Sequence, residues 1–253
     1  MSASKRIEPV FMSLGSGDRW LGYDCRRFPF GGRSAVVVRP SDPRPDGAFV
    51  WRARFFGAFP GFDEEMLRRG YWLVHVDIAD LFGGPAAMSL WDDFYAFLTG
   101  ELGLRPRPFL EGMSRGGLAV CHWAWRRPGE TAGMYLDAPV CDIGSWPHGA
   151  SAELWDRALT ALGLTVSDWR NYGRNPADLA PALAERGVPL ALVYGDADTT
   201  VPWHENGARL AAAYRAAGAP LAVWGKPGCG HHPHGLPDMA PVCDFLEAHC
   251  KEG

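Results

Sequence analysis

Several features of nucleic-acid-binding, membrane and secreted proteins are missing from this sequence. No run of lysine or arginine is longer than two residues, so we expect no nucleic-acid partner and no binding to an anionic membrane. No stretch comes near about 18 consecutive apolar residues, so no membrane-spanning helix is expected. The N-terminal segment lacks the short apolar stretch of a signal peptide, and we therefore expect a cytoplasmic protein.

Cysteine is present, but without the paired CxxC spacing of redox and metal motifs. This scatter favours a reduced set of thiols over a disulfide framework. The six cysteines are Cys25, Cys121, Cys141, Cys229, Cys243 and Cys250.

The composition fits one globular unit. The 253 residues are 47% hydrophobic and 21% charged, with a net charge of −4, which is ordinary for a soluble chain with one substantial core. Since α/β folds often reach this length as a single unit, and no linker or repeat is visible, we expect one domain over 1–253. The eleven tryptophans are unusual; beyond packing the core, such side chains line ligand pockets and sugar-binding surfaces.

Strand-like apolar runs and helical patterns alternate from about residue 48 onward. We expect strands at 48–51, 72–77, 108–111, 133–136, 189–194 and 221–224, and helices at 62–69, 87–102, 116–125, 204–217 and 240–249. Two further β-type stretches, at 20–27 and 34–38, precede them. This alternation predicts an α/β fold with a mostly parallel, twisted central sheet and helices on both faces.

The alternation breaks between residues 142 and 187. Helical pieces are expected there at 152–162 and 177–185, with no strand between them, and the segment is rich in tryptophan. We expect a small helical cap that lies over the carboxyl edge of the sheet, where α/β folds keep their sites. The alternative is a helical excursion that only closes the core.

One short motif suggests a nucleophile. The stretch Gly112-Met113-Ser114-Arg115-Gly116 matches G-x-S-x-G, a pattern that also arises by chance in a glycine-rich chain. Here it follows an expected strand and opens an expected helix, the context of a nucleophile elbow. The glycines two before and two after the serine would let strand and helix approach closely. The helix would also direct its N-terminal N–H groups at a developing oxyanion.

A serine nucleophile needs a base, and the base needs a carboxylate to orient it. The strand at 189–194 runs into Gly195-Asp196-Ala197-Asp198, so an acid lies just past a strand end. The strand at 221–224 leads into a Gly- and Pro-rich loop that carries His231, His232 and His234. Serine, acid and histidine therefore follow one another at three strand ends.

With these residues in view, the chain resembles the α/β-hydrolase superfamily from about residue 48 to the C-terminus. The resemblance rests on GMSRG, on GDADTTVP and on GCGH. It implies that Ser114 is the nucleophile, Asp198 the acid and His231 the base. Asp196 and Asp137 remain possible acids, because each also follows a strand. His232 and His234 remain possible bases.

The same resemblance implies an oxyanion hole. One donor would be the backbone N–H of Arg115, and the second an N–H from the loop after the 48–51 strand, at Phe55 or Phe56. We expect Arg52 and Arg54 in that loop to be salt-bridged surface residues. Glu111, just before the elbow, is interpreted as a strand-end hydrogen-bonding residue.

The sequence is similar in its elbow, its tryptophans and its GHHPHGL ending to bacterial sugar-ester hydrolases of the acetyl-xylan and feruloyl esterase kind. An arginine also follows the serine in glucuronoyl esterases, as Arg115 does here. However, Leu118 stands in this sequence where that elbow carries a lysine. The resemblance implies a serine esterase acting through an acyl-enzyme on a small-molecule or carbohydrate ester. We expect Trp51, Trp146 and Trp203 to be pocket walls.

No metal and no cofactor are expected. The three clustered histidines could suggest zinc, but we do not expect neighbours in one Gly/Pro loop to converge on one ion, and no HExxH motif is present. The alternatives to an esterase are a peptidase or lactonase on the same fold, or a non-catalytic ligand-binding protein.

Overall fold

A mixed nine-stranded sheet forms the centre of the computed structural model, which describes residues 3–250. The sheet order is β1-β2-β3-β5-β4-β6-β7-β8-β9. The strands are β1 (Ser16–Trp20), β2 (Tyr23–Phe30), β3 (Arg33–Arg39), β4 (Phe49–Arg52), β5 (Trp72–Val76), β6 (Phe109–Met113), β7 (Gly133–Asp137), β8 (Leu190–Gly195) and β9 (Leu221–Lys226).

The sheet changes character along its width. The pairs β1·β2, β2·β3 and β3·β5 are antiparallel, whereas the pairs from β5 through β4, β6, β7 and β8 to β9 are parallel. The predicted mostly parallel α/β fold is confirmed. The expected strand at 20–27 is wrong in its bounds, because Leu21 and Gly22 adopt positive φ values and fold the stretch into the turn between β1 and β2.

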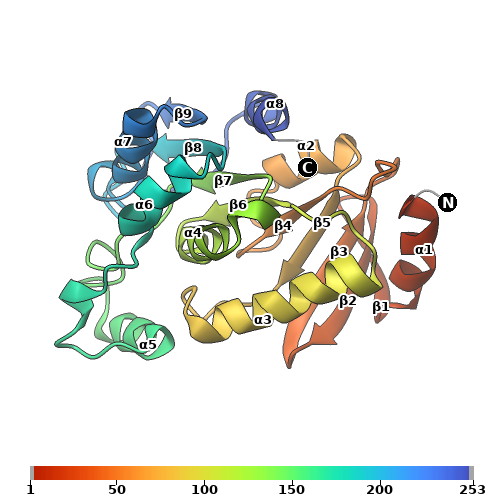
Figure 1. Cartoon of the computed structure of the whole chain (residues 1–253), viewed down its shortest axis with the longest axis horizontal. Coiled ribbons are helices and arrows are strands. Elements are labelled where there is room, and N and C mark those ends of the chain that lie inside the picture. The colour runs from red at the N-terminus through yellow and green to blue at the C-terminus, as the bar shows by residue number, and fades with distance from the viewer. Residues whose placement is uncertain (1–2, 251–253) are drawn as a thin grey trace.

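Helices cover both faces of the sheet (Figure 1). Side chains of α1, α3, α4, α6 and α7 contribute to one large core, and those of α2 and α8 to a second core on the opposite face. The helices are α1 (Ala3–Ser13), α2 (Gly61–Arg68), α3 (Pro85–Ala96), α4 (Gly116–Arg126), α5 (Ala152–Leu162), α6 (Pro176–Glu185), α7 (Gly207–Ala217) and α8 (Ala240–His249).

Helix α1 has no counterpart among the elements expected from the sequence. It carries Pro9, a residue that argues against a helix interior, and its short apolar pattern is weak. Tertiary packing outweighs this local signal, since Phe11 is fully buried and packs edge to face on Trp72 at 5.2 Å between ring centroids. The expected long helix at 87–102 is instead α3 followed by a π-helical turn over Phe97–Glu101.

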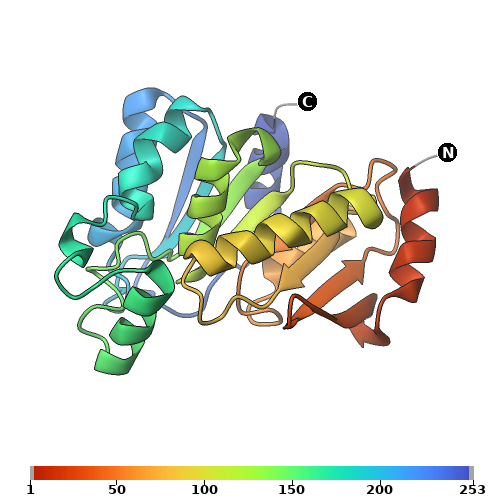
Figure 2. The same ribbon diagram turned by 60° about the horizontal axis from the view of Figure 1, so that its bottom comes forward.

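Between β7 and β8 the chain forms α5 and α6 and no strand, as predicted. The two helices have different surroundings. Leu179, Ala180 and Leu183 of α6 belong to the large core beside the sheet, so α6 is a covering helix. Figure 2 shows α5 and its flanking loops standing beyond the helical layers at one end of the strands. A separate apolar cluster that includes Phe82 and Leu118 holds α5 and its loops, which we call the cap; that they cover the site stays a prediction.

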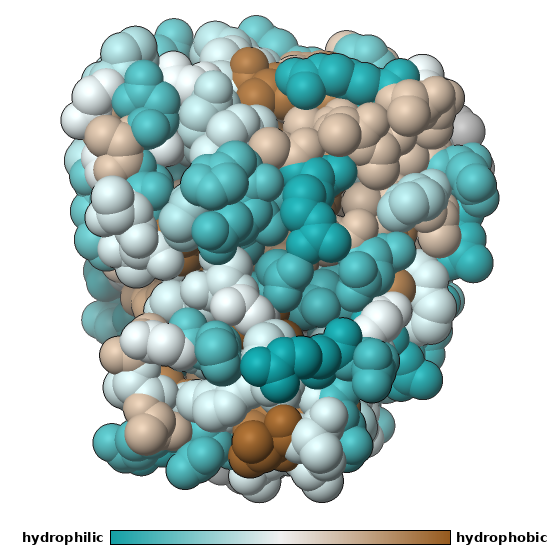
Figure 3. All heavy atoms as spheres, turned by 90° about the vertical axis from the view of Figure 1, so that its left-hand side faces the viewer, coloured by the Kyte–Doolittle hydropathy of each residue, from teal (hydrophilic) through white to brown (hydrophobic). Residues whose placement is uncertain are grey.

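Helices of residues 3–250 are all too short or too polar to cross a membrane. Figure 3 shows the side of the molecule at the left of Figure 1, where strongly hydrophobic atoms form only small separate groups among hydrophilic and neutral ones. A continuous area of weaker hydrophobicity lies at the upper right of this view.

Candidate active site

Ser114 lies on a tight turn between β6 and α4. Its φ is +49°, a left-handed conformation that side chains other than glycine rarely adopt. Two backbone hydrogen bonds hold the turn: the Ser114 N–H donates to the Asp137 carbonyl (2.9 Å) and the Val140 N–H donates to the Ser114 carbonyl (2.9 Å). The strained turn leaves the hydroxyl free to face the loops at the carboxyl edge.

The glycines of the motif act differently from our expectation. A Cβ at Gly112 would lie 2.9 Å from Val120 Cγ2 and 3.0 Å from the Gly117 nitrogen, so this position needs glycine. At Gly116 the nearest atom would be 3.5 Å away, which is an ordinary contact. The second tight position is Gly117, where a Cβ would lie 2.7 Å from Pro139 Cβ. The close approach of β6 and α4 therefore depends on Gly112, and the packing of α4 against the loop after β7 depends on Gly117.

The structure brings Ser114, His231 and Asp198 into one hydrogen-bonded chain. His231 Nε2 is 2.9 Å from Ser114 Oγ, and His231 Nδ1 is 2.7 Å from Asp198 Oδ2. The other carboxylate oxygen of Asp198 accepts the N–H groups of Thr200 and Val201, each at 2.9 Å. With Asp198 accepting from Nδ1–H, the Nε2 lone pair is directed at the serine hydroxyl.

Asp196 and His232, a possible acid and a possible base by sequence, serve different contacts. Asp196 accepts the Gly228 N–H at 2.6 Å and so anchors the turn that begins the histidine loop. His232 is exposed and stacks on Phe59, with ring centroids 5.4 Å apart. Neither side chain takes part in the Ser114 hydrogen-bond chain.

Asp137 and His234 form a second histidine–carboxylate pair. His234 Nδ1 is 2.7 Å from Asp137 Oδ1. The second oxygen of Asp137 accepts the Tyr135 hydroxyl at 2.9 Å and the Gly235 N–H at 2.6 Å. Burial and the adjacent Asp137 carboxylate raise the pKa of Tyr135, so this phenol stays protonated and donates. Asp137 thus holds both the elbow, by its carbonyl, and the histidine loop, by its carboxylate.

Arg52 forms ion pairs as expected, but the prediction that it lies on the surface is wrong. The side chain is fully buried and pairs with Asp63 and, at 3.1 Å, with Glu111. Arg52 and Glu111 are register partners in β4 and β6, so their ion pair spans the two strands. Burial, reinforced by Asp63, raises the pKa of Glu111 despite the opposing effect of Arg52. The sequence signal for this ion pair was a charged residue within each of two apolar strands, Arg52 in β4 and Glu111 in β6.

The remaining donors of Arg52 hold the loop that follows β4. They reach the carbonyls of Arg54 (3.0 Å), Phe55 (3.0 Å) and Ala58. In this loop Phe55 has a φ of +56°, a strained conformation that persists only when its surroundings impose it. Among the described hydrogen bonds, none uses the backbone N–H of Arg115, Phe55 or Phe56. These amides remain available to a ligand.

Arg115 and Trp146 lie together beside the elbow. The Arg115 guanidinium carbon is 5.6 Å from the Trp146 ring centroid and 5.9 Å from that of Phe82. Trp146 also stacks on Phe82, with centroids 6.3 Å apart. This arrangement places a cap tryptophan next to the residue that follows Ser114.

Trp51 and Trp203 do not lie at the site in this way. Trp51 has no exposed surface and stacks on Trp91, with centroids 4.3 Å apart, so its prediction as a pocket wall is wrong. Side chains of a strand alternate between the two faces of the sheet, and Trp51 is on the face that packs into the large core. Trp203 stacks on Tyr194 at 3.8 Å and packs against Gly207, which makes it a packing residue. A further contact of Trp203 with substrate stays a prediction.

The three loop histidines lie closer together than we expected. Potential ligand atoms of His231, His232 and His234 are within 4.8 Å of one another. Tetrahedral zinc with bonds of about 2.0–2.1 Å needs nitrogen atoms about 3.3 Å apart, and both nitrogens of His231 already face Ser114 and Asp198. The site could hold a metal only by giving up the Ser114 hydrogen-bond chain.

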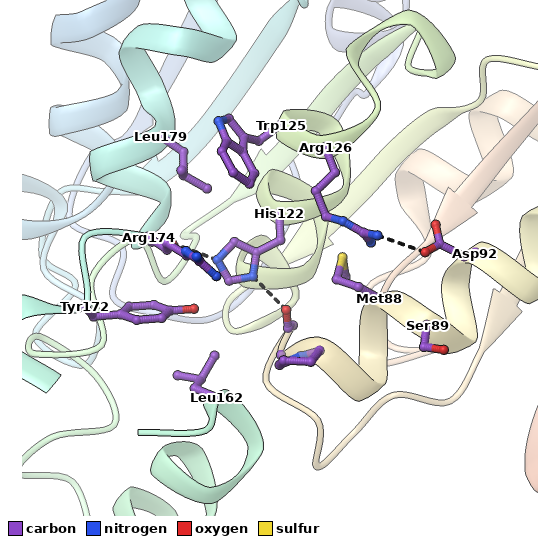
Figure 4. A pocket seen from close by; sticks show the side chains of 13 residues that line it. Met88, Ser89, Asp92, His122, Trp125, Arg126, Leu162, Tyr172, Arg174 and Leu179 are labelled. Atoms are coloured by element: carbon purple, nitrogen blue, oxygen red, sulfur yellow. Dashed lines mark hydrogen bonds and ion pairs between the residues drawn. The ribbon is translucent and has the colours of Figure 1, made fainter. Parts of the chain in front are cut away.

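A cavity of about 460 Å³ lies between α3, α4 and the cap (Figure 4). His122 forms part of its wall and bridges the carbonyls of Gly83 and Arg174, each at 2.7 Å. Arg126 and Asp92 form an ion pair at its rim. His122 is two turns along α4 from Ser114, and the cavity lining includes none of Ser114, Asp198 and His231. This cavity is separate from the hydrogen-bonded chain.

Comparisons with solved structures identify the fold. A dipeptidyl peptidase 4 of Porphyromonas gingivalis matches with a TM-score of 0.64 and 16% identity, over 91% of this chain and 36% of that one. A puromycin-hydrolyzing peptidase of Mycobacterium tuberculosis matches with 0.66 and 18%, over 89% and 38%. A protein of Thermus thermophilus matches with 0.62 and 20%, over 91% and 99%. No protein-family model and no curated protein sequence matches.

At these identities the likeness shows the fold, which is the α/β-hydrolase fold that the sequence resembles. This likeness does not support the sugar-ester hydrolase resemblance in particular. The chain spans little more than a third of the length of the two peptidases.

Proposed function

We propose that the protein is a serine hydrolase that cleaves carboxylic esters through an acyl-enzyme. The observation that carries the proposal is the unbroken chain from Ser114 Oγ through His231 to Asp198. A left-handed serine on a strand-to-helix turn adds to it, because such strain is rarely kept without a use. A protein that only binds a ligand would need neither these two contacts nor the strained turn.

The chemistry follows from the geometry. Ser114 Oγ attacks the ester carbonyl as its proton passes to His231 Nε2, and the carbonyl oxygen becomes an oxyanion. The tetrahedral species then collapses, and the leaving alcohol takes the proton from His231. Water repeats the sequence on the acyl-enzyme, releasing the acid and restoring the serine. Asp198 keeps Nδ1 protonated and stabilises the imidazolium.

The oxyanion would be bound by backbone donors. We assign the Arg115 N–H as one donor and the Phe55 N–H as the second, with Phe56 as the alternative. Their amides are unused in the described hydrogen-bond network. Arg52 contributes indirectly, because it fixes the three loop carbonyls around Phe55. No metal or organic cofactor is needed for these steps.

Trp146 is the cap residue best placed to form a substrate wall, since it lies over Arg115 next to the nucleophile. An aromatic face with one N–H donor suits a sugar ring or an aromatic acyl group. A small-molecule or carbohydrate ester is therefore the proposed substrate.

A peptidase is the second candidate, favoured by the peptidases among the similar structures. The test is hydrolysis of 4-nitrophenyl acetate, of a lactone and of aminoacyl-4-nitroanilides by wild type and by Ser114→Ala. Ester cleavage that depends on Ser114 supports the esterase. Faster Ser114-dependent release of nitroaniline would favour the peptidase, and no Ser114-dependent turnover of any substrate would contradict both.

A further inference from the structure

Two arginines beside Ser114 have no carboxylate partner within residues 3–250. Arg54 follows the buried Arg52 in the loop after β4, and Arg115 follows the nucleophile itself. Both side chains are partly buried. Among the ion pairs of residues 3–250 whose partners are described, neither arginine takes part, although most other arginines near the surface are paired.

The two guanidinium groups share one aromatic ring. The Arg54 guanidinium carbon lies 4.7 Å from the centroid of Phe55, and that of Arg115 lies 5.7 Å from it. Phe82 and Trp146 complete the apolar walls around Arg115. Aromatic faces hold such side chains in place while leaving the N–H donors at the guanidinium edge free.

The electrostatics of this pair are unfavourable without a ligand. Burial, then repulsion by Arg115, lowers the pKa of Arg54 to about 10, and burial lowers the pKa of Arg115. Asp77 and Asp80 are the acidic groups that act on these cations through space, and neither makes an ion pair with them within the described residues. Arg54 Nε is moreover buried without a hydrogen-bond partner. Two desolvated like charges near one aromatic ring are stabilised by an anion that binds to both.

We propose that Arg54 and Arg115 form a subsite for a carboxylate group carried by the substrate, within a few bonds of the scissile ester. The inference rests on the proposed hydrolase function and specifies its substrate class. A carboxylate matches the planar fork of a guanidinium and can accept from two arginines at once. The carboxylate can belong to the acyl part or to the alcohol part, and the experiment separates these sources.

The experiment compares matched esters that differ in one charge. On the acyl side, the 4-nitrophenyl monoester of adipic acid is compared with 4-nitrophenyl hexanoate. On the alcohol side, 4-acetoxybenzoate is compared with 4-acetoxybenzamide. The measured quantity is the ratio of kcat/KM for the anionic ester to that for its neutral partner. We expect one of these ratios to exceed about 10, mainly through KM, and to fall with added salt.

Variants assign the preference to the two side chains. In Arg54→Gln and Arg115→Gln the ratio should fall about 10-fold, to near 1, because each removes a charge-assisted hydrogen bond to the carboxylate. Arg54→Lys should keep part of the preference, since it keeps the charge and loses the fork. Arg215→Gln is the matched control: it removes the same charge from an exposed site at the end of α7 and should leave the ratio unchanged.

The outcomes are distinct. A raised ratio that Arg54→Gln abolishes supports the subsite, and the ester pair that shows it identifies the side that bears the charge. Ser114-dependent turnover with ratios near 1 in both pairs would overturn the subsite and leave the hydrolase intact. A raised ratio that Arg215→Gln reduces equally would reflect overall charge and would also overturn it. Absence of any Ser114-dependent turnover would remove the hydrolase and the subsite together.

Discussion

The histidine loop carries two histidine–carboxylate pairs that make the same contact in different surroundings. In each, Nδ1 is 2.7 Å from a carboxylate oxygen, for His231 with Asp198 and for His234 with Asp137. The rings of His231 and His234 are 5.0 Å apart. The Nε2 atom of His231 faces Ser114 Oγ, whereas the His234 ring packs edge to face on Phe59.

The His234–Asp137 pair is also more buried than the His231–Asp198 pair. The His231 side chain is 10% exposed and that of His234 is 3% exposed. Asp137 is enclosed by donors from Tyr135 and Gly235, with Lys226 Nζ at 3.9 Å. A histidine–carboxylate pair is therefore no catalytic signature by itself. Whether such a pair transfers protons or only supports the fold depends on the group that contacts the second ring nitrogen.

Removing the nucleophile next to the first of these two pairs should have the largest effect on activity. Ser114→Ala should lower kcat/KM for 4-nitrophenyl acetate by about 10⁴–10⁶-fold, because oxyanion and binding effects alone remain. Urea unfolding should show wild-type stability within about 1 kcal/mol. A variant with more than about a tenth of wild-type activity would place the nucleophile elsewhere.

Asp198→Asn tests the pair next to the serine. The Asn oxygen can still accept the Thr200 and Val201 N–H groups, so its NH₂ must face His231 Nδ1. This favours the tautomer with the proton on Nε2, which cannot act as base, and kcat should fall about 10⁴-fold. Stability should change little. A loss of less than about 10-fold would show that Asp198 is not the acid.

Asp137→Asn makes the same substitution in the second pair. One carboxylate oxygen accepts from Tyr135 and Gly235 and the other contacts His234 Nδ1, so the Asn NH₂ must face Nδ1, and His234 keeps this hydrogen bond only as the tautomer with its proton on Nε2. We expect a loss of about 1–3 kcal/mol in the free energy of unfolding by urea, because buried hydrogen bonds to a charged acceptor become bonds to a neutral amide. The folded fraction should keep kcat within about 10-fold. The opposite pattern, stable and inactive, would make Asp137 the catalytic acid.

Low pH will change both the activity and the stability of the protein. These two effects must be separated before the two histidine–carboxylate pairs are compared by titration. Burial lowers the pKa of His75 to about 4, from 6.5 in the unfolded chain. The unfolded state then binds more protons between these values, so stability is complete above pH 6.5 and falls as pH decreases toward 4, by roughly 3 kcal/mol. His75→Phe should flatten the pH dependence of the free energy of unfolding. An unchanged dependence would assign acid lability to other groups.

His232 supplies the smallest effect. It is exposed, and its ring lies 4.9 Å from those of both His231 and His234. His232→Ala should change kcat less than about 3-fold, whereas His231→Ala should abolish turnover, since the proton passes through His231 alone. The reverse ranking would move the base to His232.

Local sequence patterns determined most of the fold. The strands from β4 to β9 and helices such as α5 and α8 lie where period and composition place them, because parallel strands buried on both faces read as continuous apolar runs. The position of Ser114 on a turn follows equally from a strand before it and a helix after it. Order along the chain and strand ends indicated a serine, an acid and a histidine, and the resemblance to the α/β-hydrolase superfamily selected Ser114, Asp198 and His231 among the alternatives.

Only the tertiary structure decided which charged and aromatic residues are buried. Arg52 ends β4 and Arg54 stands two residues later in the following loop, yet Arg52 joins a buried ion-pair network and Arg54 has no carboxylate partner among the described residues. Trp51 and Trp146 likewise divide between core and site. Such differences depend on contacts between segments far apart in sequence, such as Arg52 with Glu111 and Arg115 with Trp146. Local propensity does not encode these contacts.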